Sequence, residues 1–323
     1  MPRHTRLLGA DAAAIAEAAA LLREGGLVGL PTETVYGLAA DATDGRAVAA
    51  IYEAKGRPHF NPLIAHLPDT ESALREGRFD ADAQALAQAF WPGPLTLVVP
   101  ISAACSVSEL ARAGLETLAL RVPAHPVAQA VLAATGRPVA APSANRSGRI
   151  SPTSAQHVLA DLDGRIDAVL DAGPTAIGVE STIVACLADG PRLLRHGGVP
   201  RSALEAVLGR PLAVDEEGGA APIAPGLLAS HYAPEAHMRI DAAAPLPGEA
   251  WLGFGPEPAG APLPALARNL SPAGDLAEAA ANLFAFMRAL DDGAPQVIAV
   301  APIPASGLGD AINDRLRRAA APR

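Results

Sequence analysis

Residues 118–141 read LALRVPAHPVAQAVLAATGRPVAA and decide the fold class. Leu118 to Val122 form an apolar run of strand length. Pro126 to Thr135 are rich in alanine, begin with proline and precede Gly136, the order of residues that favours a helix. Val139 to Ala141 form a second short apolar run. Short apolar runs that alternate with helices predict the buried strands of an α/β protein.

The same alternation extends in both directions from this stretch. The expected helices cover Ala10–Glu24, Asp44–Lys55, Asp80–Phe90, Ala155–Leu162 and Arg201–Leu208. The further expected strands are Leu27–Leu30, Leu63–Leu67, Leu95–Val99, Ala168–Leu170 and Ser181–Ala185.

A length of 323 residues indicates two domains. The composition becomes acidic and then rich in Gly, Ala and Pro after residue 213, as in a linker. We therefore predict a first domain at 1–212, a linker at 213–236 and a small α/β domain at 237–323. Its expected strands and helices are Trp251–Phe254, Leu276–Leu290, Val297–Val300 and Leu308–Ala320. The last helix ends in Arg315, Arg317 and Arg318, cations that suit a helix C-terminus.

Charge and composition exclude several classes of protein. The net charge is −9 and only 3% of residues are aromatic, which disfavours a nucleic-acid surface. The N-terminal apolar run breaks at Glu17, and no uncharged stretch is free of proline for the length of a membrane span. Cys105 and Cys186 lack the spacing of a zinc or disulfide framework. We expect a cytoplasmic protein without membrane contact.

One lysine stands against 24 arginines, and it is Lys55. Lys55 and Arg57 flank a glycine at the end of a predicted helix, and Pro58 then turns the chain, so both cations can converge on one anion such as polyphosphate. Asn61 and His66 follow closely. The alternative is that these cations only interact favourably with the dipole at the helix C-terminus.

The segment after the strand at 139–141 reads PSANRSG. Ser143 and Asn145 at a strand end suit phosphate or ribose oxygens. Ser151 precedes Pro152 and could instead cap the next helix. Capping alone does not explain Ser143 and Asn145.

Single polar residues stand at other predicted strand ends: Thr32, Arg121, Ser181 and Arg195. An arginine that ends a buried strand can clamp a carboxylate, and neighbouring hydroxyls can position an amino acid. Together these groups predict a polar cleft over the sheet. Walker A, G-x-G-x-x-G, G-x-S-x-G and H-E-x-x-H motifs are absent, so nucleotide chemistry would need a different pocket.

These residues resemble a known family. Thr32–Gly37 (TETVYG), Lys55–His66, Trp91–Leu97 (WPGPLTL), Pro142–Asn145 (PSAN), Glu180–Val184 (ESTIV) and His231–Pro234 (HYAP) are similar to the threonylcarbamoyl-AMP synthases of the YrdC-like superfamily. The match runs through about residues 8–234, and the tail resembles the extra domain of the longer members. The resemblance implies a YrdC-like twisted mixed sheet with helices, plus a small C-terminal Rossmann-like α/β domain.

The resemblance also implies a reaction, in which L-threonine, bicarbonate or CO2 and ATP give threonylcarbamoyl-AMP and pyrophosphate for the threonylcarbamoyladenosine modification of tRNA. Lys55 and Arg57 would be catalytic. Contacts to ATP would come from Lys55, Arg57, Asn61, Thr117, Ser143, Asn145, Ser151, Arg195, His231 and Tyr232. Contacts to threonine would come from Thr32, His66, Arg121, Ala141 and Ser181. Mg²⁺ would arrive with ATP, and no metal cage built from protein ligands is expected.

Two other functions stay open at this point. Some YrdC-like proteins have been proposed to be nonenzymatic RNA-binding or ribosome-binding modules, and binding of double-stranded RNA is possible but is not favoured by the charge of −9. A carbamoyl-transfer domain would require a large partner domain, and residues 235–323 are too few for one. The expected downstream partner is the complex that transfers threonylcarbamoyl to tRNA.

Overall fold

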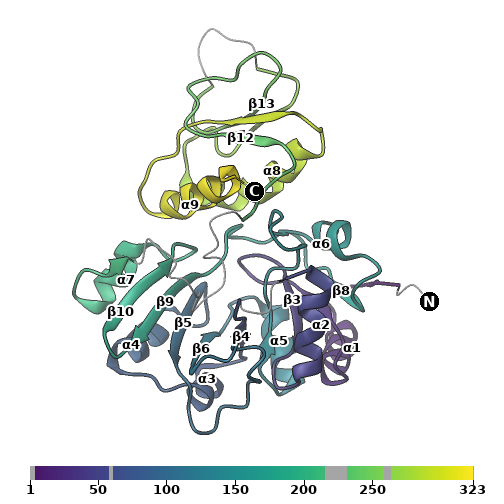
Figure 1. Cartoon of the computed structure of the whole chain (residues 1–323), viewed down its shortest axis with the longest axis vertical. Coiled ribbons are helices and arrows are strands. Elements are labelled where there is room, and N and C mark those ends of the chain that lie inside the picture. The colour runs from purple at the N-terminus through teal and green to yellow at the C-terminus, as the bar shows by residue number, and fades with distance from the viewer. Residues whose placement is uncertain (1–3, 58–60, 215–230, 258–262, 323) are drawn as a thin grey trace.

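The computed structural model describes residues 4–57, 61–214, 231–257 and 263–322. Most of these residues surround a mixed sheet of eleven strands in the order β1-β8-β2-β3-β7-β4-β6-β5-β9-β10-β11 (Figure 1). The strands are β1 (Arg6–Leu8), β2 (Val28–Leu30), β3 (Gly37–Asp41), β4 (Ile64–His66), β5 (Leu95–Pro100), β6 (Thr117–Arg121), β7 (Val139–Ala140), β8 (Ala168–Leu170), β9 (Thr182–Leu187), β10 (Gly190–Arg195) and β11 (Ala213–Val214). The helices are α1 (Ala12–Arg23), α2 (Gly45–Lys55), α3 (Thr70–Glu76), α4 (Ala81–Phe90), α5 (Pro126–Thr135), α6 (Ala155–Leu162) and α7 (Arg201–Leu208).

A second, parallel sheet of four strands forms the C-terminal part, in the order β12-β15-β13-β14. Its elements are β12 (His237–Arg239), β13 (Ala250–Gly253), β14 (Ala267–Asn269), α8 (Leu276–Asp291), β15 (Val297–Val300) and α9 (Leu308–Ala320). Figure 1 shows α8 and α9 between this sheet and the larger part of the molecule. The predicted fold class, a mixed α/β sheet plus a small α/β domain, is confirmed.

The sequence prediction missed β1, β3, β10, β11, β12, β14 and α3. The sequence of β3 is GLAAD, which lacks β-branched residues, and β10 begins with Gly-Pro-Arg, so neither has a strand composition. β1 and β12 are three-residue edge strands with partly exposed side chains. Such strands form because a neighbouring strand offers hydrogen bonds, and local propensity does not show this.

Helix starts follow the local sequence closely. In six helices a side chain at the N-cap accepts a backbone N–H of the first turn, and these caps are Asp11, Asp44, Asp69, Asp80, Ser154 and Asp275. Helix α6 therefore begins after Ser154. The alternative that Ser151 caps this helix is wrong.

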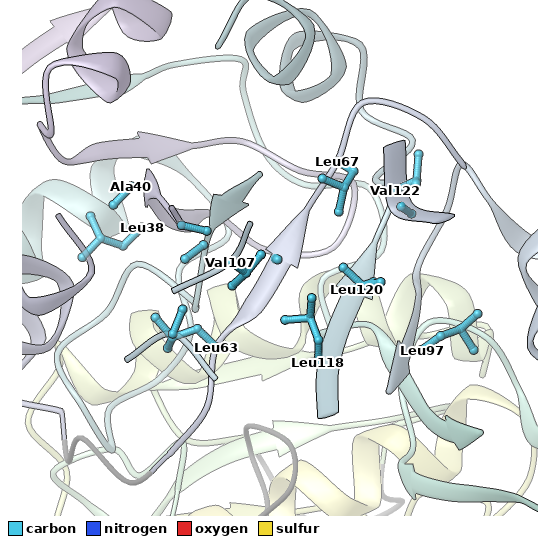
Figure 2. Packing of buried hydrophobic residues seen from close by; sticks show 14 of the residues in the cluster. Leu38, Ala40, Leu63, Leu67, Leu97, Val107, Leu118, Leu120 and Val122 are labelled. Atoms are coloured by element: carbon cyan, nitrogen blue, oxygen red, sulfur yellow. The ribbon is translucent and has the colours of Figure 1, made fainter. Parts of the chain in front are cut away.

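Alternation along the central strands separates a core face from a cleft face. Leu118, Leu120 and Val122 pack with Leu97 and other apolar residues in the main core, which Figure 2 shows from close by. Side chains of a strand point alternately to opposite faces, so Ala119 and Arg121 must point the other way. Ala119 indeed belongs to a small separate cluster with Ile64, Val98 and Ile183. Arg121 and His66 extend this second face at the carboxyl ends of β6 and β4.

An irregularity in β10 brings one more cation to the same face. Leu193 pairs with Val184 and Arg195 pairs with Ile183, so Leu194 is an extra residue in this strand. A bulge of this kind changes which face the following side chain takes. Arg195 therefore lies opposite Ile183 on the cleft face.

The two parts of the molecule share a hydrophobic cluster. Val35, Ile150 and Val179 of the larger part pack with residues of α8 and α9 such as Phe284 and Ile312. Arg288 of α8 donates to Asp161 Oδ2 at 2.7 Å. Among the residues that the structure describes, no helix has the length and apolar character needed to cross a bilayer.

Gly178 provides a test of this packing. A Cβ atom at Gly178 would lie 2.2 Å from the carbonyl oxygen of Ala280 and 2.5 Å from Cα of Ala281, both in α8, and its φ is +77°. We expect Gly178→Ala to lower the free energy of unfolding by about 2–4 kcal/mol, because rigid backbone must shift as well as bear the strain. Chemical denaturation measures this change.

Gly173→Ala is the matched control, since its φ is +79° with no atom within 4 Å of the added Cβ. It should cost only the strain of a left-handed alanine, about 1 kcal/mol. Equal losses in the two variants would contradict the close approach of Gly178 to α8.

Candidate active site

A cavity of about 50 Å³ lies on the cleft face of the large sheet. It is lined by Thr34, Val35, Arg57, Ile64, His66, Arg121, Ala141, Pro142, Ser143, Glu180, Ser181, Arg195, His231 and Tyr232. Three of these residues are arginines and one is a glutamate, so the lining carries an excess of positive charge although the whole chain has a net charge of −9. The excess favours an anionic ligand.

Arg121 lines the cavity and is held by three partners. Its Nη2 donates to Glu33 Oε1 at 2.5 Å, its Nη1 to Thr34 Oγ1 at 2.9 Å and its Nε to the carbonyl oxygen of Gly93 at 3.3 Å. A guanidinium has five N–H groups. One N–H on each terminal nitrogen thus has no partner among the described residues, which is the pair that a carboxylate can accept.

Lys55 joins the two predicted anion-binding loops. It is 3% exposed, and its ammonium donates to the carbonyl oxygens of Ser143 and Asn145. Burial and the neighbouring Arg57 lower the pKa of Lys55 well below its ordinary value. The segment is braced further by a hydrogen bond of 2.6 Å from Ser143 Oγ to Asn145 Oδ1. The lysine therefore fixes the shape of the PSAN segment.

Arg57 lies in the cavity wall with part of its hydrogen-bonding capacity unused. Its Nη2 donates to the carbonyl oxygens of Asn61 and Pro62 at 3.5 and 3.3 Å, while its Nε is buried without a described partner. Burial lowers the pKa of Arg57 to about 10, so the group stays charged at neutral pH. Oδ1 of Asn61 is likewise buried without a described partner. Both groups are suited to a polar ligand.

Two histidines of the cavity are uncharged. Burial lowers the pKa of His66 to about 3, with a further decrease from Arg121, and burial also lowers the pKa of His231 to about 3. His66 Nδ1 lies 3.2 Å from the carbonyl oxygen of Ile64. His231 Nδ1 is buried without a described partner. Neutral imidazoles can donate or accept a hydrogen bond without adding charge.

Ser181 and Arg195 form a second polar corner. Arg195 Nε donates to the carbonyl oxygen of Ser181 at 3.1 Å, and its Nη2 lies 3.2 Å from the hydroxyl of that residue. The Ser181 hydroxyl also lies 2.8 Å from Thr96 Oγ1 on β5. The side chain of Ser181 is therefore fixed from two sides.

Glu180 connects the cavity to the C-terminal part of the molecule. Its Oε1 accepts from Ser151 Oγ at 2.5 Å and its Oε2 accepts from Arg315 Nε at 2.8 Å. Burial alone would raise the pKa of Glu180, but the guanidinium groups of Arg315 and Arg195 outweigh it and lower the pKa. Arg315 also lies over the ring of Tyr232, 5.3 Å from its centroid.

Arg315 differs from the sequence prediction. It is 0% exposed, so it is an interior partner of Glu180 instead of a solvated cation at a helix end. Ser151 does not cap a helix either, because its hydroxyl donates to the Glu180 carboxylate. Both contacts join residues far apart in the chain, which no local pattern shows.

Two protein families match this chain. A protein family described as "Telomere recombination" matches residues 20–197, and a family described as "Threonylcarbamoyl-AMP synthase, C-terminal domain" matches residues 199–321. The Bacillus subtilis threonylcarbamoyl-AMP synthase is 44% identical, over 96% of this chain and 93% of the relative. The one from Pyrococcus abyssi is 40% identical, over 94% and 92%.

The chain belongs to the threonylcarbamoyl-AMP synthase family. The crystal structure described as P. abyssi Sua5 complexed with L-threonine is similar over 98% of both chains, with a TM-score of 0.90 and 37% identity. The family is one of adenylating enzymes, so the chain is an enzyme of the nucleotidyltransferase type.

Within this synthase fold, the structure brings nine of the predicted site residues to the cavity. They are Arg57, His66, Arg121, Ala141, Ser143, Ser181, Arg195, His231 and Tyr232. Four others contact these residues or the loops that carry them: Lys55, Asn61, Asn145 and Ser151. The assigned roles of all these residues remain predictions.

Two predicted residues lie away from the cavity lining. Thr32 Oγ1 donates to the carbonyl oxygen of Val35 at 2.6 Å and shapes its own loop, while Thr34 reaches the cavity. Thr117 begins β6, at the opposite end of that strand from Arg121. Sequence reasoning missed Thr34 and Glu180 as cavity residues, although both stand inside motifs that it quoted.

Removal of Arg315 tests the connection through Glu180. We expect Arg315→Met to lower the free energy of unfolding by about 3–5 kcal/mol, because it leaves the buried Glu180 carboxylate without its cation. The measurement is chemical denaturation at neutral pH. Arg75→Met removes an equivalent pair with Glu71 whose side chains are 61% and 88% exposed, and should cost less than about 1 kcal/mol. Similar losses in both variants would contradict the buried pair.

The neutral His66 predicts a pH dependence of stability. The folded-state pKa of about 3 lies below the unfolded value of about 6.5, so the unfolded chain gains a proton that the folded chain does not hold. Stability is therefore lost as pH falls below about 6.5, and this residue contributes a loss of about 2 kcal/mol by pH 5.

Denaturation at pH 7 and pH 5 measures this loss. His66→Gln should remove about 2 kcal/mol of the difference between the two pH values, while His4→Gln, at an exposed position, should remove none. An unchanged difference in His66→Gln would show that His66 is protonated in the folded protein.

Proposed function

We propose that this enzyme forms threonylcarbamoyl-AMP and pyrophosphate from L-threonine, bicarbonate or CO2, and ATP. The observation that carries the proposal is the cavity with three guanidinium groups. It is lined by Arg57, by the PSAN segment and by Arg121, in a chain that belongs to this family. An adenylating enzyme must bind a polyphosphate and a second anion side by side. Three guanidinium groups in the lining of one cavity are suited to that task.

The two substrates would occupy opposite ends of the cleft. The unused N–H groups of Arg121 would donate to the carboxylate of threonine, with Thr34, His66 and Ser181 around its polar atoms. Lys55, Arg57, Ser143 and Asn145 would contact the phosphates of ATP. The third N–H of the Lys55 ammonium remains for a phosphate oxygen, since two donate to carbonyl oxygens.

The chemical step needs proximity more than covalent help from the protein. The amine of threonine combines with CO2 and loses a proton, which gives a carbamate. A carbamate oxygen then forms a bond to the α-phosphorus of ATP while the bond from that phosphorus to the pyrophosphate oxygen breaks. The cleft would hold the carbamate in line with this bond. Arg57 and Lys55 would offset charge on the departing pyrophosphate.

Mg²⁺ fits this site as a companion of ATP. The described residues contain no group of three or more His, Cys, Asp or Glu side chains that could hold a metal ion. Glu180 is the carboxylate in the cavity lining, and both of its oxygens already accept hydrogen bonds. The ion would therefore be held by phosphate oxygens and water, and would supply charge neutralisation.

His231 and Tyr232 would exclude water from the reaction. The carbamate and the mixed anhydride are both labile in water, so the site must exclude water during the chemical step. These two residues lie within the predicted linker at 213–236 and line the cavity. We infer that they move away when substrates enter and return for the chemical step.

The product would serve tRNA modification in the cytoplasm. Threonylcarbamoyl-AMP is an activated donor, so its consumer must be an enzyme complex that transfers threonylcarbamoyl to adenosine in tRNA. We infer both the partner complex and the cytoplasmic compartment from the family to which the chain belongs.

Lys55→Ala tests the assignment at the phosphate end. Incubation with ATP, bicarbonate and L-threonine followed by mass spectrometry should show threonylcarbamoyl-AMP with the wild type and at least about 100-fold less with the variant. The reason is the loss of both a phosphate donor and the clamp on the PSAN segment. Arg46→Ala removes an exposed cation from the same helix and should leave the yield unchanged. Normal yield from Lys55→Ala would refute the assignment.

A further inference from the structure

A second cavity, of about 200 Å³, lies within the C-terminal domain. Ile240 and Asp241 follow strand β12, and Ala301 and Ile303 follow strand β15, which pairs with β12 in parallel. In open parallel sheets, ligands bind beyond the carboxyl ends of the strands. An apolar cavity of about 150 Å³ can hold a benzene molecule, so this volume is sufficient for a small metabolite.

The rim of this cavity carries opposite charges. Asp241 and Arg317 are both exposed at the cavity, and neither forms an ion pair with a described residue. Asn313 donates from Nδ2 to the carbonyl oxygen of Ile303 at 3.0 Å. Its amide oxygen is left as the group that can accept a hydrogen bond from a ligand. The floor is apolar and includes the buried Ile303 and Leu316.

We propose that this cavity is a binding site for a free α-amino acid with an aliphatic side chain. Arg317 would bind the α-carboxylate, Asp241 and the amide oxygen of Asn313 would bind the ammonium group, and the side chain would lie on Ile303 and Leu316. A nucleotide is a poorer match, because Asp241 repels phosphate and Arg317 is the single cation among the described lining residues. A metal cation is a poorer match because of Arg317.

Helix α9 connects this site to the catalytic cleft. Asn313, Leu316 and Arg317 face the cavity, whereas Arg315 and Arg318 contact the cleft side. Arg315 binds Glu180, and the carbonyl oxygen of Arg318 accepts the backbone N–H of His231 at 3.2 Å. Residues at i and i+2 lie on opposite sides of a helix. A ligand that shifts α9 would therefore act on Glu180 and His231, and the site is an effector site.

Calorimetric titration of the full chain with L-leucine tests the binding, without ATP or bicarbonate. We expect saturable binding at one site. 4-Methylpentanoate lacks the ammonium group and leucinamide lacks the carboxylate, and each should bind at least about tenfold more weakly than leucine.

Variants locate the site. Arg317→Met and Asp241→Asn should each weaken leucine binding at least about tenfold. Asparagine tolerates the φ of +55° at position 241, so this variant retains the backbone. Arg268→Met removes another exposed arginine of the same domain and should have no effect. Arg121→Met removes the carboxylate clamp predicted in the catalytic cleft and should also leave leucine binding unchanged.

A second measurement tests the coupling, which rests on the proposed function. Saturating leucine should change the rate of pyrophosphate release at least twofold in the wild type and leave it unchanged in Arg317→Met. Absence of saturable leucine binding, equal binding of leucinamide, or loss of binding in Arg121→Met but not in Arg317→Met would overturn the site. Binding without any effect on the rate would overturn the effector role. Absence of all pyrophosphate release would refute the proposed function and leave the binding result standing.

Discussion

The carboxylate of Glu180 is the contact on which both parts of the molecule depend. It is a buried anion, and a buried charge is stable only when its hydrogen bonds and its counter-charge are in place. Ser151 supplies the hydrogen bond from the larger part, and Arg315 supplies the cation from the C-terminal helix. The catalytic cleft therefore reaches its observed shape only when the C-terminal domain is docked. The C-terminal domain contributes no described residue to the cavity lining, yet it supplies the counter-charge of one lining residue.

The local sequence was sufficient for most of the strands and loops that carry the site, with β10 as an exception, but not for the long-range pairs of the site. The sequence placed Arg121 at the end of a buried strand as a candidate carboxylate clamp, and the structure places it in the cavity lining at the end of β6. Ser151 and Arg315 were misjudged because their partner Glu180 lies 29 and 135 residues away. A helix-capping motif and a helix dipole are the strongest local explanations for such residues. Only in the folded chain does Glu180 lie beside Ser151 and Arg315, and its hydrogen bonds with them take the place of the local contacts.

The single lysine illustrates the same limit in a different way. Its isolation among 24 arginines marked Lys55 as special, and its position beside Arg57 suggested a phosphate ligand. The structure adds a second reason for a lysine: two carbonyl oxygens of the PSAN segment converge on one ammonium group. A compact group with three rotating donors can satisfy both, whereas a planar guanidinium requires its acceptors in one plane. The two loops thus form one unit before any nucleotide is bound.

Binding of two substrates raises the question of which wall of the cavity can move. Tyr232 is buried, but its backbone has a φ of +63°, a left-handed conformation that costs a residue with a Cβ about 1–2 kcal/mol. Its contacts with His231, Phe284 and Arg315 hold it there. Movement of this segment would break those contacts but would also relieve the backbone strain, and this relief offsets part of the free energy lost with the contacts. Movement of β4 or β6 would instead break sheet hydrogen bonds with nothing in return. The linker end is therefore the side of the cavity that opens at the lowest cost.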